Sequence, residues 1–116
     1  MLKECGGIRK VYIACGRTDL RKGIDSLAAR IGNEFSLNPF EEGTLFLFCG
    51  NRKDRVKGLL YEGDGYLLLY KRLTDGRFQW PNSPQEAKQL SMEEYRMLLE
   101  GFSIEKTIHK YTPKRL

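Results

Sequence analysis

The spacing of apolar residues along the chain predicts a short strand followed by a helix. Residues 9–15 are rich in β-branched and aromatic side chains, which is typical of a strand. From Leu20 to Phe35 apolar residues recur at steps of three and four, which is the period of a helix with one buried face. Because Thr18 stands just before this run, we expect its side chain to cap the helix.

Several strands are predicted to follow this helix. Residues 44–49 are apolar on both faces, which favours a central strand. Segments 55–61 and 66–73 flank the turn Gly63-Asp64-Gly65, and this combination is the strongest hairpin signal in the chain. A shorter segment ends at Trp80, after which two prolines are expected to end the sheet.

A second helix is predicted over residues 92–100 from the residues at its two ends. Ser91 and Glu94 have the spacing of a capping box. Gly101 stands where a glycine commonly ends a helix.

The order of these elements predicts an α+β fold: a mostly antiparallel sheet of about four to five strands with the two main helices packed on one face. The chain has 116 residues, of which 41% are hydrophobic and 30% charged, as expected for one globular core. We expect a single domain over 1–105 and a basic, flexible tail over 106–116.

No segment has the length and apolar content of a membrane span. The longest apolar runs have four or five residues, whereas a bilayer requires about 20. The N-terminal residues also lack the apolar stretch of a secretory signal, so a cytoplasmic location is expected.

Cysteine usage favours buried thiols over disulfides or a metal site. Cys5, Cys15 and Cys49 are odd in number and show no C-x-x-C spacing. With the single histidine, His109, they could form a zinc set, but the spacing of metal ligands is absent. No metal and no cofactor are expected.

Positive charge is concentrated around the predicted hairpin. The net charge is +5, and residues 52–77 contain seven bases and four acids. If the hairpin loop has an even number of residues, strand alternation puts the following side chains on one face: Arg55, Lys57, Leu59, Tyr61, Tyr66, Leu68, Tyr70 and Arg72.

The opposite hairpin face is the more apolar one and is expected to pack on the helices, with Lys71 at its edge. The first face is then a basic and aromatic surface suited to phosphates and bases. Two alternatives stay open: the tyrosines could form the rim of the core, and an odd loop length would exchange the two faces.

Catalytic chemistry has little support in the sequence. Glu62 and Asp64 with Lys71 could form a metal-dependent nuclease site, but carboxylates beside a tight turn are favoured for backbone reasons. The only histidine lies in the tail, and neither a P-loop nor a G-x-G-x-x-G motif is present. No catalytic residue is therefore assigned.

Six motifs in order resemble one family over nearly the whole chain. They are T-D-x-R-K-G-x-D at 18–25, D-R-x-K at 54–57, G-D-G at 63–65, Y-K-R-L at 70–73, G-R-F-x-W-P at 76–81 and L-L-E-G at 98–101. In this combination the chain closely resembles the small accessory transposition proteins of insertion sequence family sixty-six, called TnpB or second open reading frame.

The resemblance implies a bacterial accessory factor encoded beside a larger transposase that carries out strand transfer. With the charge pattern, it leads us to expect a non-catalytic protein that binds DNA at the insertion-sequence ends together with that transposase. The expected DNA-binding residues are Arg21, Lys22, Arg52, Lys53, Arg55, Lys57, Tyr70, Lys71, Arg72, Arg77 and Trp80. The main alternative is a module that docks on the transposase without touching DNA.

Overall fold

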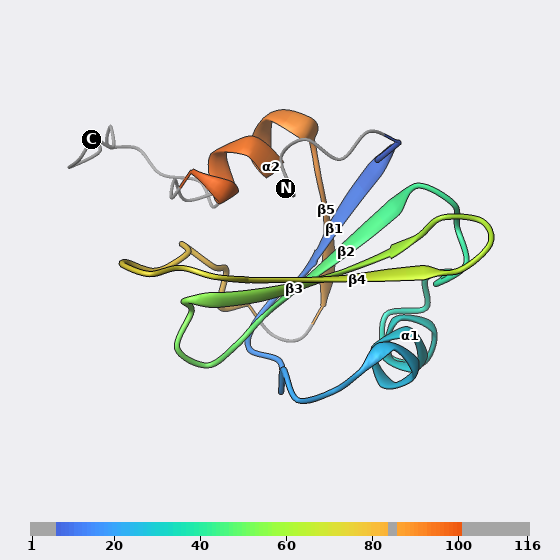
Figure 1. The fold of residues 1–116 in the computed structure, drawn as a ribbon, viewed down its shortest axis with the longest axis horizontal. Helices are drawn as coiled ribbons and strands as arrows, with labels where there is room; N and C mark the ends of the chain where they lie inside the picture. The colour runs from blue at the N-terminus through green and yellow to red at the C-terminus, as the bar shows by residue number, and fades with distance from the viewer. Residues whose placement is uncertain (1–6, 84–85, 101–116) are drawn as a thin grey trace.

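A computed structural model describes residues 7–83 and 86–100, which form one five-stranded sheet and two helices (Figure 1). The elements are β1 (Lys10–Ala14), α1 (Ile24–Asn33), β2 (Thr44–Cys49), β3 (Arg55–Tyr61), β4 (Tyr66–Arg72), β5 (Ala87–Leu90) and α2 (Met92–Leu99). Among the residues that the structure describes, neither helix has the length and apolar content needed to cross a bilayer.

The sheet is mixed but mostly antiparallel, with strand order β4-β3-β2-β1-β5. β1 and β2 are parallel and are joined through α1, whereas the other three neighbouring pairs are antiparallel. The predicted α+β class and the predominance of antiparallel pairing are thereby confirmed. Parallel pairing of β1 and β2 places their carboxyl ends at the same end of the sheet.

β2 is the central strand that its composition predicts. All six of its residues are buried. Leu45 and Leu47 belong to the apolar cluster on one face of the sheet, whereas Phe46 and Phe48 belong to the cluster on the other. A strand that is apolar on both faces must be covered on both faces.

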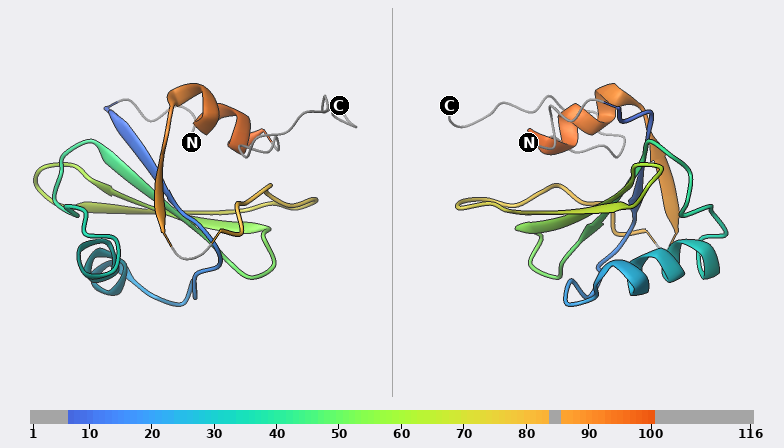
Figure 2. Two further views of the ribbon diagram at one scale, coloured as in Figure 1. Left: turned by 180° about the vertical axis from the view of Figure 1, so that it is seen from behind. Right: turned by 45° about the vertical axis from the view of Figure 1, so that its right-hand side comes forward.

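The two helices provide this cover from opposite sides, so the prediction that both pack on one face is wrong. Leu27 and Ile31 of α1 pack in the cluster that contains Phe48. Tyr95 and Leu98 of α2 lie in the other cluster. In Figure 1 α2 lies above the sheet and α1 below it, and both views of Figure 2 agree. The physical reason is the two-sided apolar character of β2.

The start of α1 also differs from the prediction. The helix begins at Ile24, and its N-cap is Gly23, which has extended backbone angles and no side-chain capping bond. Thr18 is buried, and its hydroxyl accepts a 2.7 Å hydrogen bond from Arg30 Nη1. Thr18 therefore does not cap α1 but attaches the preceding loop to the side of the helix.

The sheet continues beyond the prolines that were expected to end it. β5 pairs antiparallel with β1 as an edge strand. Only Leu90 of its four residues is fully buried, so the segment carries no clear alternation of apolar and polar positions. The short segment that ends at Trp80 forms no strand of its own.

The capping box of α2 is confirmed. The Ser91 hydroxyl accepts a 3.0 Å hydrogen bond from the Glu94 backbone N–H, and the Glu94 carboxylate accepts one of 2.8 Å from the Ser91 N–H. Gly101, His109 and the expected tail over 106–116 lie outside the described residues.

Candidate nucleic-acid interface

The hairpin has the even loop length on which the prediction of its faces depended. Tyr61 pairs with Tyr66, so four residues connect β3 and β4. The same register pairs Arg55 with Arg72 and Lys57 with Tyr70. The predicted division of the hairpin into two faces is therefore confirmed.

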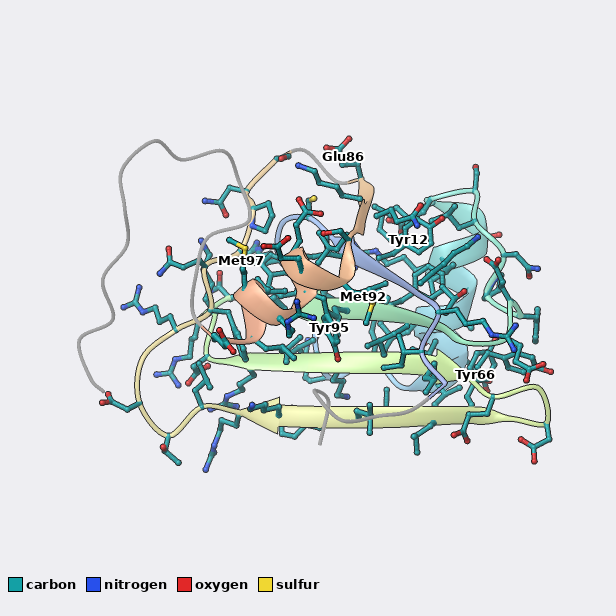
Figure 3. All side chains as sticks on the ribbon, turned by 90° about the horizontal axis from the view of Figure 1, so that it is seen from above. Tyr12, Tyr66, Glu86, Met92, Tyr95 and Met97 are labelled. Atoms are coloured by element: carbon teal, nitrogen blue, oxygen red, sulfur yellow. The ribbon has the colours of Figure 1, made fainter. Side chains whose placement is uncertain are left out.

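Only half of the predicted surface is open, because α1 covers the loop end of that face. Leu59, Tyr66 and Leu68 pack in the apolar cluster of α1. Tyr66 lies at the loop end of the hairpin (Figure 3), and its hydroxyl donates a 2.8 Å hydrogen bond to the Pro39 carbonyl. For Tyr66, the alternative in which the tyrosines form the rim of the core is the correct one.

The open half consists of four residues, which we call the hairpin face: Arg55, Lys57, Tyr70 and Arg72. Tyr70 is 48% exposed, and Lys57 Nζ lies 6.0 Å from the centre of its ring. At this distance the ammonium group is attracted to the ring face. Three positive groups and one aromatic ring therefore share a single patch on the sheet.

The loop after β1 extends this patch. A shallow groove of about 480 Å³ is lined by Leu20, Arg21 and three members of the hairpin face, Arg55, Lys57 and Tyr70. Lys57 Nζ also donates a 3.1 Å hydrogen bond to the backbone carbonyl of Lys22. Two segments far apart in the sequence, each with predicted binding residues, are thus brought together.

The loop that carries Arg21 is held by its own polar residues. Both nitrogens of the Arg21 fork donate 2.9 Å hydrogen bonds to the Asp19 carboxylate, which also accepts a 3.0 Å bond from the Arg21 backbone. These bonds keep the pKa of Asp19 well below its usual range. Arg30 anchors the same loop through Thr18, while its guanidinium lies 5.1 Å from the Phe35 ring.

Arg55 is the residue of the hairpin face that has an acidic partner among the ion pairs of the described residues. Its Nε lies 3.4 Å from Asp54 Oδ1, an ion-pair distance, yet neither atom makes a hydrogen bond with good geometry. Lys57 and Arg72, in contrast, have no acidic partner among the ion pairs of the described residues. These two cations are therefore the most available for an anionic ligand.

A second basic feature, which we call the basic cavity, lies where the carboxyl ends of β1 and β2 meet. It has a volume of about 740 Å³. Its lining is Gly16, Arg17, Gly50, Asn51, Arg52, Lys53, Asp54, Gly76, Arg77, Trp80 and Asn82. The lining therefore includes four cationic residues and a single acid.

Two of the predicted DNA-binding residues, Trp80 and Lys71, are not exposed on either basic surface. Trp80 is only 5% exposed, and its indole N–H donates a 2.9 Å hydrogen bond to the Ala14 carbonyl. Lys71 pairs with Val56 and therefore points to the face opposite Tyr70, where it is half-buried. Its position at the edge strand gives the stem a route to solvent.

Eight bases lie in the loops after β1, β2 and β4 or at the strand ends beside them, which we call the basic end of the sheet; in Figure 1 the loops after β2 and β4 lie on the left, and the loop after β1 runs along the bottom toward α1. Its members are Arg17, Arg21, Lys22, Arg52, Lys53, Arg55, Arg72 and Arg77. Arg17 was missed by the sequence reasoning. The feature that points to Arg17 is its position shortly after β1, a strand that runs parallel to β2.

Acidic residues gather at the opposite end of the sheet: Glu41, Glu42, Glu62 and Asp64. The nuclease alternative required Glu62 and Asp64 to converge with Lys71. These acids lie in the hairpin loop, whereas Lys71 lies near the far end of β4. Within residues 7–83 and 86–100, no three His, Cys, Asp or Glu side chains are close enough to share a metal ion.

The sequence model of a family described as IS66 Orf2-like protein matches residues 9–109. A protein of Sinorhizobium fredii (strain NBRC 101917 / NGR234) named y4hO is 40% identical over 92 residues, which is 79% of each chain. Another protein of that strain, y4jC, is 31% identical over 101 residues, covering 87% of this chain and 85% of its own. No solved structure matches.

Proposed function

Because this chain belongs to the IS66 Orf2-like family, we propose that it is an accessory factor of insertion-sequence transposition that binds duplex DNA through its hairpin face. It acts in the bacterial cytoplasm with a separate transposase, which carries out strand transfer. The observation that supports DNA binding is the open hairpin face that carries Lys57, Tyr70 and Arg72, with Arg21 beside Lys57 and Tyr70 in the adjoining groove.

The chemistry of this patch fits a nucleic-acid backbone. Lysine and arginine side chains bind phosphate oxygens, and such contacts provide most of the non-specific affinity of DNA-binding proteins. The Tyr70 ring offers a stacking surface or a hydroxyl donor beside them. The acidic residues at the other end of the sheet orient the protein, because they repel the same backbone.

The test is a titration of labelled duplex DNA from the insertion-sequence ends at several salt concentrations, with the variant Lys57→Ala/Arg72→Ala. Arg55 is left in place because it pairs with Asp54. Loss of two phosphate contacts is expected to reduce the log–log salt slope by about 1.8 and to weaken binding at low salt.

The matched control is Arg9→Ala/Arg96→Ala, which removes the same charge from exposed residues outside both the hairpin face and the basic end. This variant should retain nearly all of the affinity and the original salt slope. Equal losses in the two variants, or absence of binding by the unaltered protein at low salt, would refute DNA binding through the hairpin face.

A second candidate function is docking on the transposase without DNA contact, and one observation favours it. Phe40 is 59% exposed and lies 5.6 Å from the Tyr61 ring and 5.8 Å from the Tyr66 ring, at the acidic end. Exposed aromatic residues are enriched in protein interfaces. Trp80, in contrast, is buried and therefore offers no such contact.

Copurification with the transposase, with and without nuclease treatment, distinguishes the two functions. If docking is direct, the complex survives nuclease and moderate salt, and Phe40→Ala weakens it. Met92→Ala serves as the control because Met92 is also an exposed large apolar side chain, at 43% exposure, but lies on α2. A complex that nuclease dissolves would exclude direct docking.

A further inference from the structure

The basic cavity has an unusual balance of charge for a protein surface. None of its four cations, Arg17, Arg52, Lys53 and Arg77, takes part in an ion pair among the described residues. The one acid of the lining, Asp54, lies beside Arg55, which is outside the cavity lining. The cavity lining therefore carries four positive charges against one negative charge.

Neutral side chains hold two of these cations in place. Arg17 Nη1 donates a 3.3 Å hydrogen bond to Asn51 Oδ1, and Lys53 Nζ donates one of 3.1 Å to Asn82 Oδ1. An amide oxygen orients a cation without neutralising it. Both groups consequently keep their full charge and further donors for a ligand.

The backbone of Lys53 is fixed in a conformation that non-glycine residues rarely adopt. Its φ is 64°, in the left-handed region. Its N–H donates to the Gly50 carbonyl at 3.1 Å, and its carbonyl accepts from the Phe78 N–H at 2.7 Å. The second bond joins the loop after β2 to the segment after β4, so two parts of the cavity wall are linked through the backbone.

Glycines keep parts of the cavity wall free of side chains. Gly76 has a φ of +84°, and a side chain at that position would meet no atom within 4 Å. A volume of about 740 Å³ is in the range of sites for small ligands and is large enough for one nucleotide. The shallow groove of the hairpin face, in contrast, suits a continuous backbone.

From these features we propose that the basic cavity binds the terminal phosphate of a DNA strand together with the nucleotide that carries it. A terminal phosphate monoester has a second negative charge that an internal phosphodiester lacks, and it projects from the end of the duplex into a concave site. Arginine forks and a lysine are the side chains that bind such a dianion. This inference rests on the proposed function, because it assigns the hairpin face to the duplex and the cavity to its end.

The experiment compares short duplexes that are closed by a hairpin at one end and carry a phosphate or a hydroxyl at the other. At fixed salt, the unaltered protein is expected to bind the phosphorylated end about ten-fold more tightly, as a charge-assisted set of hydrogen bonds predicts. Strands phosphorylated at the 5′ or the 3′ end are tested separately, and a preference for either supports the proposal. Equal affinity for phosphate and hydroxyl ends overturns it.

Two variants provide reciprocal controls. Arg52→Ala/Arg77→Ala alters exposed residues of the cavity that make no hydrogen bond or ion pair in the described residues, so the fold should be retained. It is expected to abolish the preference for a phosphate and to leave most of the affinity for closed circular duplex. Lys57→Ala/Arg72→Ala should show the converse, and retention of the phosphate preference in the cavity variant would contradict the proposal.

Closed circular DNA separates the two proposals because it has no ends. If the protein binds circles but shows no phosphate preference, the cavity assignment fails and the proposed function stands. If it binds neither circles nor hydroxyl ends but binds phosphorylated ends, the cavity assignment stands and binding of duplex through the hairpin face fails.

Discussion

The indole N–H of Trp80 donates a 2.9 Å hydrogen bond to the backbone carbonyl of Ala14, 66 positions earlier in the chain. This bond attaches the segment that follows the hairpin to the last residue of β1, at the basic end of the sheet. Trp80 also packs on Phe78, with ring centres 6.5 Å apart. The residue that the sequence suggested as a ligand contact is thus a buried structural link in the wall of the basic cavity.

Trp80→Phe is expected to lower the free energy of unfolding by about 1–3 kcal/mol, because a buried carbonyl loses its donor. Since Trp80 is the single tryptophan, urea unfolding should be followed by far-UV circular dichroism rather than fluorescence. Tyr70→Phe, an exposed aromatic change on the hairpin face, should shift stability by no more than about 0.5 kcal/mol. Similar losses in both variants would contradict the structural role of Trp80.

Arg30→Met should loosen the loop that carries Arg21. The Arg30 side chain is only 9% exposed and donates to Thr18, so removing its guanidinium should cost about 1.5–3 kcal/mol. Hydrogen exchange of the Thr18 amide, which donates to the Cys49 carbonyl, should become faster. Glu34→Gln breaks only the exposed ion pair of Arg30 and is expected to cost less than about 1 kcal/mol.

Gly43→Ala is expected to destabilise the fold far more than Gly65→Ala. Gly43 is buried with a φ of +81°, and an added Cβ would lie 2.9 Å from the Gly7 carbonyl oxygen. The left-handed conformation alone should cost an alanine about 1–2 kcal/mol. Gly65 has neither a positive φ nor a neighbour within 4 Å of an added Cβ. Equal chemical denaturation midpoints for the two variants would show that the turn at Gly43 accepts an alanine.

Stability above pH 9 should depend on Cys49. Burial raises the pKa of this thiol from 9.0 to about 12, whereas the thiol ionises near its ordinary pKa in the unfolded chain. The protonated thiol therefore contributes stability below pH 9, and this contribution is lost as the pH rises toward 12.

The measurement is the difference in unfolding free energy between the unaltered protein and Cys49→Ala as a function of pH. Subtraction removes the titration of lysines and tyrosines that the two chains share. The unaltered protein should lose stability relative to the variant by up to about 1.4 kcal/mol per pH unit above pH 9. A difference that stays constant with pH would contradict the inferred shift.

Much of the hairpin and its open face followed from local sequence. Strand alternation and a four-residue loop are enough to put Arg55, Lys57, Tyr70 and Arg72 on one side, because both are properties of adjacent residues. The same holds for the capping box at Ser91 and Glu94, whose partners are three positions apart.

Other features depended on partners distant in the chain. Threonine is a residue type that commonly caps helices, yet the Thr18 hydroxyl accepts a hydrogen bond from Arg30 on the side of α1. Arg17 enters the candidate site only because β1 and β2 run parallel and end together. β5 carries little pattern of its own and is a strand because β1 provides a partner.

The sequence by itself determined the helices, four of the five strands, the register of the hairpin and a concentration of base around it. These depend on periodicity, turn residues and charge, which act over short distances along the chain. The tertiary structure decided that the helices cover opposite faces, that Trp80 is buried, and that the cations of three separate loops line one cavity. These outcomes depend on which surfaces must be removed from water together, and that requirement is met only when the whole sheet assembles.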